Sequence, residues 1–208
     1  MSLLRLLIIP AIALLAGCAS ALAPVLKPNV EQGASALRAG QYELDETHAA
    51  LIFRINHLGF SEFVGRFNVF GASLDFDEAD PGSAKIDSVI DMTSLDVAND
   101  DFAATLMGPQ WFDAAAYPQA RFTSTAITIT GETTGTMTGD LTLHGVTQPV
   151  TLDVVFNGGA RDRLRGNAYI AGFSAHGTIS RAAFGVARFS GVITDDVEIE
   201  IQAEFKKR

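Results

Sequence analysis

"DDVEIEIQAEFKKR", residues 195–208, alternates apolar and polar side chains with a period of two. Every second residue from Val197 to Phe205 is apolar, and the residues between them are Glu or Gln. Such alternation predicts a β-strand with one dry face and one wet face. Residues 84–92 and 150–156 repeat the pattern, so the chain is predicted to be rich in half-buried strands.

About eight segments of this kind lie in residues 41–208, separated by Gly, Asp, Asn and Pro. Two Thr-rich segments joined at Gly131-Glu132 predict a hairpin. Residues 99–107 predict the only helix of this region, capped by Asn99 or Asp100 and ended by a Gly-Pro pair. Many strands of even spacing favour an all-β fold, either an antiparallel barrel or a sandwich.

Residues 1–17 have the layout of a lipoprotein signal peptide. Arg5 precedes an apolar run over residues 6–16, and Cys18 follows a Leu-Ala-Gly sequence. We predict cleavage before Cys18 and lipidation of its thiol, with an uncleaved anchor or a plain signal peptide as the alternatives. No Asp follows Cys18, which favours attachment to the outer membrane.

Residues 18–40 are rich in Ala, Pro and small polar residues, which predicts a lipidated N-terminus and a flexible tether. One domain is then expected over residues 41–208, long enough for a substantial core. The formal net charge of −9 argues against nucleic acid as a partner, because phosphate neutralisation needs a basic face. Cys18 is the single cysteine, so an intramolecular disulfide is excluded.

His48 and His57 stand at the two ends of a predicted strand. Their parity is opposite and about 30 Å of extended chain separates them, so they do not form a joint site. His57 ends an apolar row where a barrel would open. A hydrogen bond to a loop carbonyl is its ordinary role, and acid/base chemistry is the alternative. Without HExxH, CxxC or G-x-S-x-G in the sequence, neither a metal site nor a catalytic nucleophile is predicted.

Large apolar side chains face the interior from several of the predicted strands. They either fill a packed core or line an elongated apolar tunnel, and composition does not separate the two. Trp111 and Phe112 lie in a connection outside the strands, where they plug the core or close the mouth of a cavity. The apolar parity switches after Gly71, which indicates a β-bulge.

Four segments in order along the chain carry a family resemblance: "YELDETHAALIFRINHLGFSEFVGRFNVFGASLDFD", "WFDAAAYPQARFTSTAI", "GDLTLHGVTQPVTLDV" and "ISRAAFGV". They resemble successive signatures of the YceI-like family, whose members are periplasmic, lipocalin-like barrels that bind isoprenoid lipids. The resemblance runs from Tyr42 to the C-terminus. It departs from the family pattern at Ala182 and Ala183, and in the lipoprotein signal, since many relatives diffuse freely.

The resemblance implies an eight-stranded antiparallel lipocalin-like barrel with one short helix and a capping loop near the mouth. It implies binding without turnover, in which the barrel sequesters or transfers a polyprenyl phosphate or an isoprenoid quinone. Some members are associated with a cytochrome b561-type membrane protein. The lumen residues expected on this basis are Phe53, Ile55, Phe63, Phe67, Val69, Trp111, Phe112, Phe122, Leu141, Leu143, Phe156, Phe173 and Phe205.

The expected head-group residues are His57, Arg181 and Arg188, because Arg forms bidentate hydrogen bonds with phosphate and His can hydrogen-bond to a carbonyl. For both arginines a solvated loop charge is the alternative. Two other functions stay open: an enzyme that acts on an amphipathic lipid with His57 as acid/base, and a structural envelope lipoprotein without a ligand. The oligomeric state also stays open, with a dimer among the options.

Overall fold

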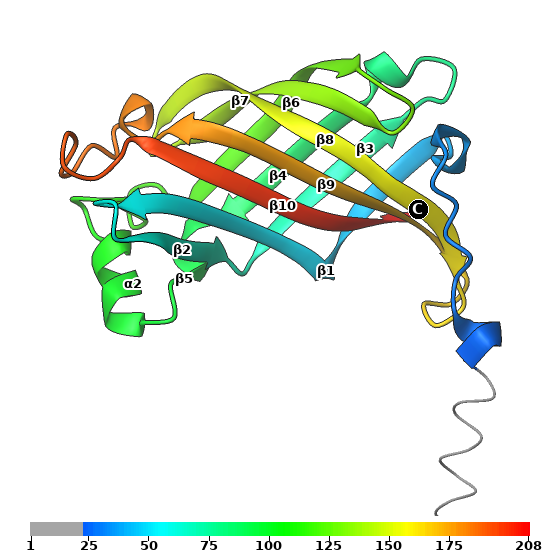
Figure 1. Ribbon diagram of the computed structural model, residues 1–208, viewed down its shortest axis with the longest axis horizontal. Helices are drawn as coiled ribbons and strands as arrows, with labels where there is room; N and C mark the ends of the chain where they lie inside the picture. The colour runs from blue at the N-terminus through cyan, green and yellow to red at the C-terminus, as the bar shows by residue number, and fades with distance from the viewer. Residues whose placement is uncertain (1–22) are drawn as a thin grey trace, which may run out of the picture.

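The computed structural model describes residues 23–208, which form a single elongated antiparallel barrel (Figure 1). The prediction of an all-β barrel is confirmed. The strands are β1 Gly40–His57, β2 Ser61–Phe67, β3 Phe70–Phe76, β4 Lys85–Asp91, β5 Leu95–Asp96, β6 Gln119–Ile129, β7 Thr134–Leu143, β8 Val146–Asp162, β9 Ala168–Ser180 and β10 Asp196–Lys207.

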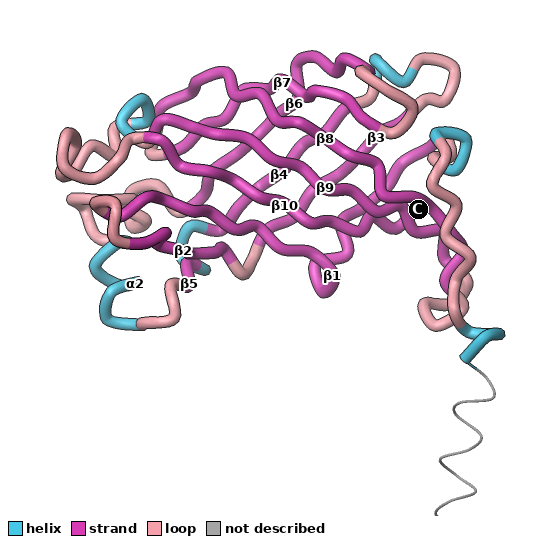
Figure 2. The backbone as a smooth tube through the Cα atoms, in the orientation of Figure 1, coloured by secondary structure: helices cyan, strands magenta, loops and turns pink. Residues whose placement is uncertain are grey.

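The barrel closes where the first strand meets the last. β1 pairs with β10 in antiparallel register, for example Leu51 with Ile201, and the sheet runs β10-β9-β8-β7-β6-β4-β3-β1 around the ring. Every strand of the ring therefore has two hydrogen-bonded neighbours, and the ring itself leaves no open edge (Figure 2).

Eight strands form the ring and two more, β2 and β5, extend it at one end. β2 is separated from β3 only by Asn68-Val69, and β5 from β4 only by the 3-10 turn η3 Met92–Ser94. The two extra strands are thus the bent continuations of β3 and β4. This explains why the sequence pattern predicts about eight strands.

The bend between β2 and β3 also corrects one expectation. The sequence places Val69 on the inward face and the parity switch after Gly71. In the structure the switch falls at Asn68-Val69, so that Phe70 points inward and Val69 is 51% exposed. Around this bend both the odd-numbered and the even-numbered residues are apolar. Alternation alone therefore does not show at which residue the inward face changes.

Helix α2, Asp100–Met107, covers one end of the barrel beside β2 and β5 (Figure 1). The side chain of Asn99 accepts a hydrogen bond from the backbone N–H of Phe102 at 2.9 Å, which confirms the predicted cap. Leu106 is buried, whereas Phe102 remains partly exposed at the end of the barrel.

An Arg-centred cluster holds a bulge of β1 against the opposite end of the barrel. The register of β1 against β10 shifts between Leu44 and Ala49, which extrudes the residues between them. Arg165 Nη1 lies 2.9 Å from Asp45 Oδ2 and 2.6 Å from Glu204 Oε2, and its Nε lies 2.6 Å from Asp162 Oδ2. One guanidinium therefore ties together β1, β8 and β10.

We expect acid to destabilise the protein through this cluster. Burial raises the pKa of Asp45, but hydrogen bonds from Thr47, Arg165 and His48 outweigh it and hold that pKa well below its usual range. The hydrogen bond from Arg165 likewise lowers the pKa of Asp162. Carboxyls with lowered pKa contribute stability above their unfolded pKa of about 4, and this contribution is lost as the pH falls below it.

The measurement is the urea midpoint as a function of pH, with Arg165→Gln as the comparison. The wild-type midpoint should fall as the pH drops from about 5 to 3. The variant should start from a lower midpoint and show a smaller fall, because the pKa values of both carboxyls move back toward normal. Parallel pH profiles would contradict the assignment.

Part of the segment before the barrel is held against β8 and β9. Glu31 forms an antiparallel bridge with Gly159 of β8, and the Tyr169 hydroxyl donates to the carbonyl of Ala36 in the 3-10 turn η1 Ala34–Ala36. Ala36 is buried. Residues 31–36 therefore contact the barrel, in contrast with the free tether expected over residues 18–40.

Candidate lipid-binding site

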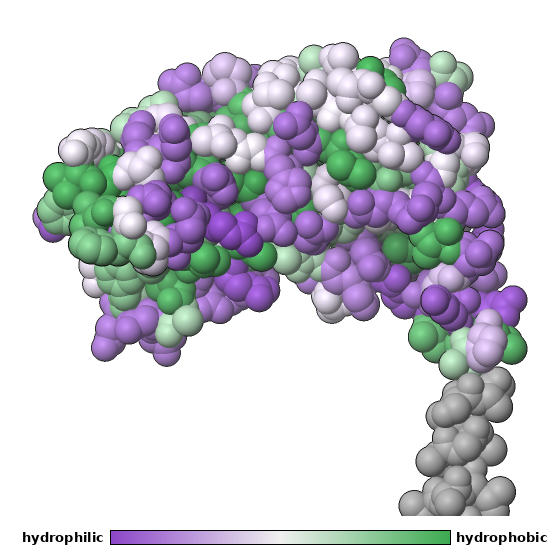
Figure 3. Space-filling view, in the orientation of Figure 1, coloured by the Kyte–Doolittle hydropathy of each residue, from purple (hydrophilic) through white to green (hydrophobic). Residues whose placement is uncertain are grey.

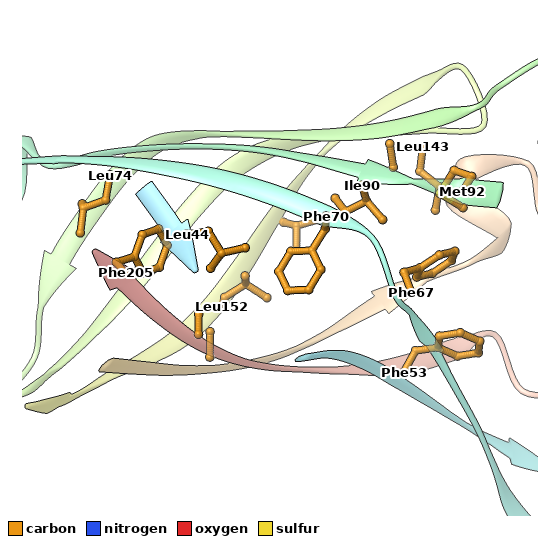
Figure 4. Packing of buried hydrophobic residues seen from close by; sticks show 14 of the residues in the cluster. Leu44, Phe53, Phe67, Phe70, Leu74, Ile90, Met92, Leu143, Leu152 and Phe205 are labelled. Carbon is orange, nitrogen blue, oxygen red and sulfur yellow. The ribbon is translucent and has the colours of Figure 1, made fainter. Parts of the chain in front are cut away.

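A long apolar cavity of about 960 Å³ runs through the interior of the barrel. Its wall is built from the inward-facing residues of the ring strands, and side chains from opposite walls point toward the shared interior (Figure 4). The C-terminal strand contributes its whole apolar row, from Val197 to Phe205. The volume lies at the upper end of the roughly 300–1,000 Å³ that is typical of small-molecule sites.

The aromatic rings pack along the wall and leave the middle of the barrel open. Phe156 and Phe173 have ring centroids 5.3 Å apart, and Phe173 and Phe205 have centroids 5.8 Å apart. Phe53 and Phe67 follow at 5.9 Å. Each of these pairs joins neighbouring strands, so the rings contact one another side by side. The arrangement favours a tunnel over a filled core.

One glycine makes room for a ring against the wall. Gly65 lies directly opposite Phe53 in the β1–β2 pair, and a Cβ on Gly65 would lie 2.6 Å from Cε1 of Phe53. The ring of Phe53 thus occupies the space that a side chain at position 65 would fill. As a result it rests over the neighbouring strand and leaves the lumen free.

The structure places nearly all of the expected lumen residues on the cavity wall. Val69 is the exception, and its place is taken by Phe70, which shares the even-numbered parity of Leu74 and Phe76. Those that line the cavity are Phe53, Ile55, Phe63, Phe67, Trp111, Phe112, Phe122, Leu141, Leu143, Phe156, Phe173 and Phe205. Residues that the sequence analysis did not single out as lumen residues also line it, among them Leu44, Phe70, Leu74, Ile90 and Leu152.

Exposed residues line the cavity at both ends, and we call the end beside α2 its mouth. The cavity wall there includes His57 and Ser61, which flank the β1–β2 turn, together with Phe102 of α2. Trp111 and Phe189 complete this end, with ring centroids 6.1 Å apart. Trp111 and Phe112 therefore line the cavity near its mouth.

Arg181 lies in the cavity wall and is only 5% exposed. Its Nε and both terminal nitrogens donate to four backbone carbonyls of the segment that leads from β9 to β10. The acceptors are the oxygens of Val186, Arg188, Ile193 and Thr194, at 2.7–3.2 Å. Four of the five guanidinium N–H groups are thus used to hold this loop, and one remains for a ligand.

The other two expected head-group residues have different settings. His57 lines the cavity, and within residues 23–208 no side chain hydrogen-bonds to its imidazole. Arg188 is not part of the cavity wall, and its guanidinium stacks 4.7 Å from the ring centroid of Phe189. His48 lies in the β1 bulge, with Nδ1 2.9 Å from Asp45 Oδ2, so the two histidines belong to separate places.

The two ends of the cavity differ in charge. The Arg181 guanidinium lies at the mouth, whereas Glu78 and Glu132 line the opposite end, where η1 also contacts the cavity. An anionic group is therefore disfavoured at the end that carries the glutamates and favoured at the mouth.

Residues 23–208 contain neither a membrane-spanning helix nor a cluster of metal ligands. No helix there has the length and apolar content that a membrane span needs. In the same residues no three His, Cys, Asp or Glu side chains surround a common metal position. Cys18 and the predicted signal peptide lie outside the described residues.

Comparison with known proteins gives consistent matches over the barrel. Residues 42–205 match the YceI-like domain family. A UPF0312 protein of Pseudomonas savastanoi pv. phaseolicola is 36% identical over 179 residues, which cover 83% of this chain and 92% of the relative. The crystal structure of Burkholderia cenocepacia BcnA is similar with a TM-score of 0.70 and 26% identity, covering 77% of this chain and 98% of BcnA.

A third protein shares the fold at low sequence identity. It is a polyisoprenoid binding domain from Saccharophagus degradans, described as implicated in plant cell wall breakdown. The TM-score is 0.58 and the identity 18%, with 80% of this chain and 98% of that domain covered.

Proposed function

This chain belongs to the YceI-like family, and on that premise we propose that its barrel binds a long-chain isoprenoid lipid and sequesters or transfers it without turnover. The polyisoprenoid binding domain with the same fold supports this choice of ligand class. A polyprenyl phosphate and an isoprenoid quinone both have the required apolar tail and compact polar head.

The observation that carries the proposal is the apolar cavity along the barrel axis. Each methylene that moves from water into such a cavity contributes roughly 0.8 kcal/mol, so a long prenyl tail needs few directional contacts. The wall supplies aromatic and branched aliphatic side chains from every ring strand, with Phe70 and Leu152 among them (Figure 4).

The charges at the two ends support a head group at the mouth and a tail inside the barrel. His57 offers a hydrogen bond to a carbonyl or phosphate oxygen, and Arg181 has one free N–H in addition to its positive charge. The tail then extends toward the end lined by Glu78 and Glu132. Arg188 lies beside the mouth, over Trp111 and Phe189, where it adds positive charge near the head group.

We place this activity in the bacterial periplasm, with the protein attached to the outer membrane through lipidated Cys18. The signal-peptide layout of residues 1–17 and the small residues before Cys18 support this location. A cytochrome b561-type membrane protein is the proposed protein partner, on the strength of the family resemblance alone.

The test is organic extraction of the full chain purified from native membranes, followed by mass spectrometry. We expect a prenyl lipid close to equimolar with protein. Ala175→Phe adds a ring to the wall in the middle of the lumen and should lower occupancy roughly tenfold. His176→Phe adds the same ring at the neighbouring, exposed position of β9 and should leave occupancy unchanged.

Repeated extraction of wild-type protein without any prenyl lipid would contradict the proposal. Equal occupancy in the Ala175 and His176 variants would show that the extracted lipid lies outside the barrel.

A further inference from the structure

Five exposed apolar side chains surround the mouth of the cavity, and we call them the apolar rim. They are Leu58, Phe60, Phe102, Phe189 and Val192. They come from three segments far apart in sequence: the β1–β2 turn, α2 and the β9–β10 loop (Figure 1). Figure 3 shows apolar surface gathered over this end of the molecule.

The rim is exposed to an extent that is unusual for side chains of this kind. Phe60 is 86% exposed, Val192 63% and Phe189 53%. Contiguous apolar surface of this type marks a binding surface, because leaving it in water is unfavourable. Phe102 and Phe189 also line the cavity, so the rim is continuous with the lumen.

We infer that the apolar rim docks into the surface of a phospholipid bilayer, so that lipid passes between membrane and lumen without crossing water. This inference rests on the proposed function. An isoprenoid that leaves a membrane through water exposes its whole tail, at roughly 0.8 kcal/mol per methylene. When the mouth is inserted among the lipid head groups, the tail does not have to cross water. A bilayer is therefore the surface that the rim fits.

The chemistry of the rim agrees with a membrane interface. The Arg188 guanidinium lies over the rings of Trp111 and Phe189, at 5.9 and 4.7 Å from their centroids. Aromatic rings with an adjacent cation are favoured where the acyl chains of a bilayer meet its head groups. The net charge of −9 disfavours a strongly anionic surface, so zwitterionic lipid is the matching partner.

Trp111 is the only tryptophan in the chain and lies at the mouth, so its fluorescence reports on docking directly. The experiment mixes the full chain with phosphatidylcholine vesicles whose acyl chains carry bromine, a contact quencher of tryptophan. The rim variant is Phe60→Asp with Val192→Asp. The control is Leu164→Asp with Val155→Asp, which adds the same charge at exposed apolar positions elsewhere on the barrel.

We expect strong quenching in wild type and control, and at least roughly fivefold weaker quenching in the rim variant. Absence of quenching in wild type would overturn the inference. So would equal quenching in the rim variant, since bromine would then reach Trp111 through the cavity. A third outcome is that wild type self-associates but is not quenched, and that the rim variant no longer self-associates. The rim would then bind a second copy of the chain, and the inference would be overturned.

Prenyl-lipid occupancy of the same samples separates this inference from the proposed function. Lipid retained in a rim variant that no longer docks supports both. Lipid retained in a wild-type protein that does not dock overturns only the docking surface.

Discussion

Replacing Arg181 with Met should lower the free energy of unfolding by about 3 kcal/mol or more and release the segment between β9 and β10. The guanidinium is buried and donates to four carbonyls of that segment. Met keeps most of the side-chain volume but donates no hydrogen bond, so partly buried carbonyls lose their partners. Urea unfolding gives the stability, and hydrogen exchange over residues 182–195 reports the loosening of the loop.

Two comparison variants make this prediction specific. Arg181→Lys keeps the charge, but a single ammonium does not reach all four acceptors, so it should rescue only a small part of the loss. Arg188→Met removes a nearby arginine that stacks on Phe189, and should change stability by less than about 1 kcal/mol. If hydrogen exchange over residues 182–195 is as slow in Arg181→Met as in wild type, the loop keeps its structure without the guanidinium and the prediction is wrong.

Replacing Gly65 with Val should destabilise the barrel by roughly 1–3 kcal/mol and constrict the lumen near its mouth. The new side chain occupies the position where the Phe53 ring lies, and Val97 is also near, with Cγ1 3.0 Å from a Cβ at position 65. The ring of Phe53 then has to turn inward, toward Phe67 and the cavity. The urea midpoint and the amount of co-purified prenyl lipid should both decrease.

Gly71→Val is the matched control, because it places the same residue in the adjoining strand β3. A Cβ at Gly71 meets only a carboxylate oxygen of Glu46 at 3.7 Å, an ordinary contact. Stability should stay the same or rise, since Val favours extended backbone. If Gly65→Val keeps full lipid occupancy, the position of Phe53 does not control the bore of the tunnel.

Much of the fold follows from side-chain alternation. The row from Val197 to Phe205 faces the cavity as its parity predicts, and the hairpin at Gly131-Glu132 and the helix capped by Asn99 form where the sequence places them. These are local features, set by residues within a few positions of one another. The break at Asn68-Val69 is different, because its position depends on how two strands bend together around the barrel.

The interior illustrates what sequence alone leaves open. The same phenylalanines suit a filled core or a tunnel, and the difference lies in which residue each ring faces across the sheet. The position of Phe53 over Gly65 depends on the β1–β2 register, and composition does not reveal that register. The sequence pattern also does not reveal that Arg181 donates to carbonyls up to thirteen residues along the chain in addition to facing the cavity.

Two contacts limit how far the barrel could stand from a membrane that holds a lipidated Cys18: the bridge between Glu31 and Gly159, and the hydrogen bond that Arg163 Nη1 donates to the Val25 carbonyl at 2.6 Å. Only residues 19–24 separate the cysteine from Val25, a contour of about 25 Å at full stretch. The described part of the chain begins, in blue, at the end of the barrel opposite α2 (Figure 1). If Cys18 is lipidated as proposed, a barrel whose N-terminal end faces the anchoring bilayer has its mouth directed away from that bilayer, and cargo would then be exchanged with the facing membrane of the envelope.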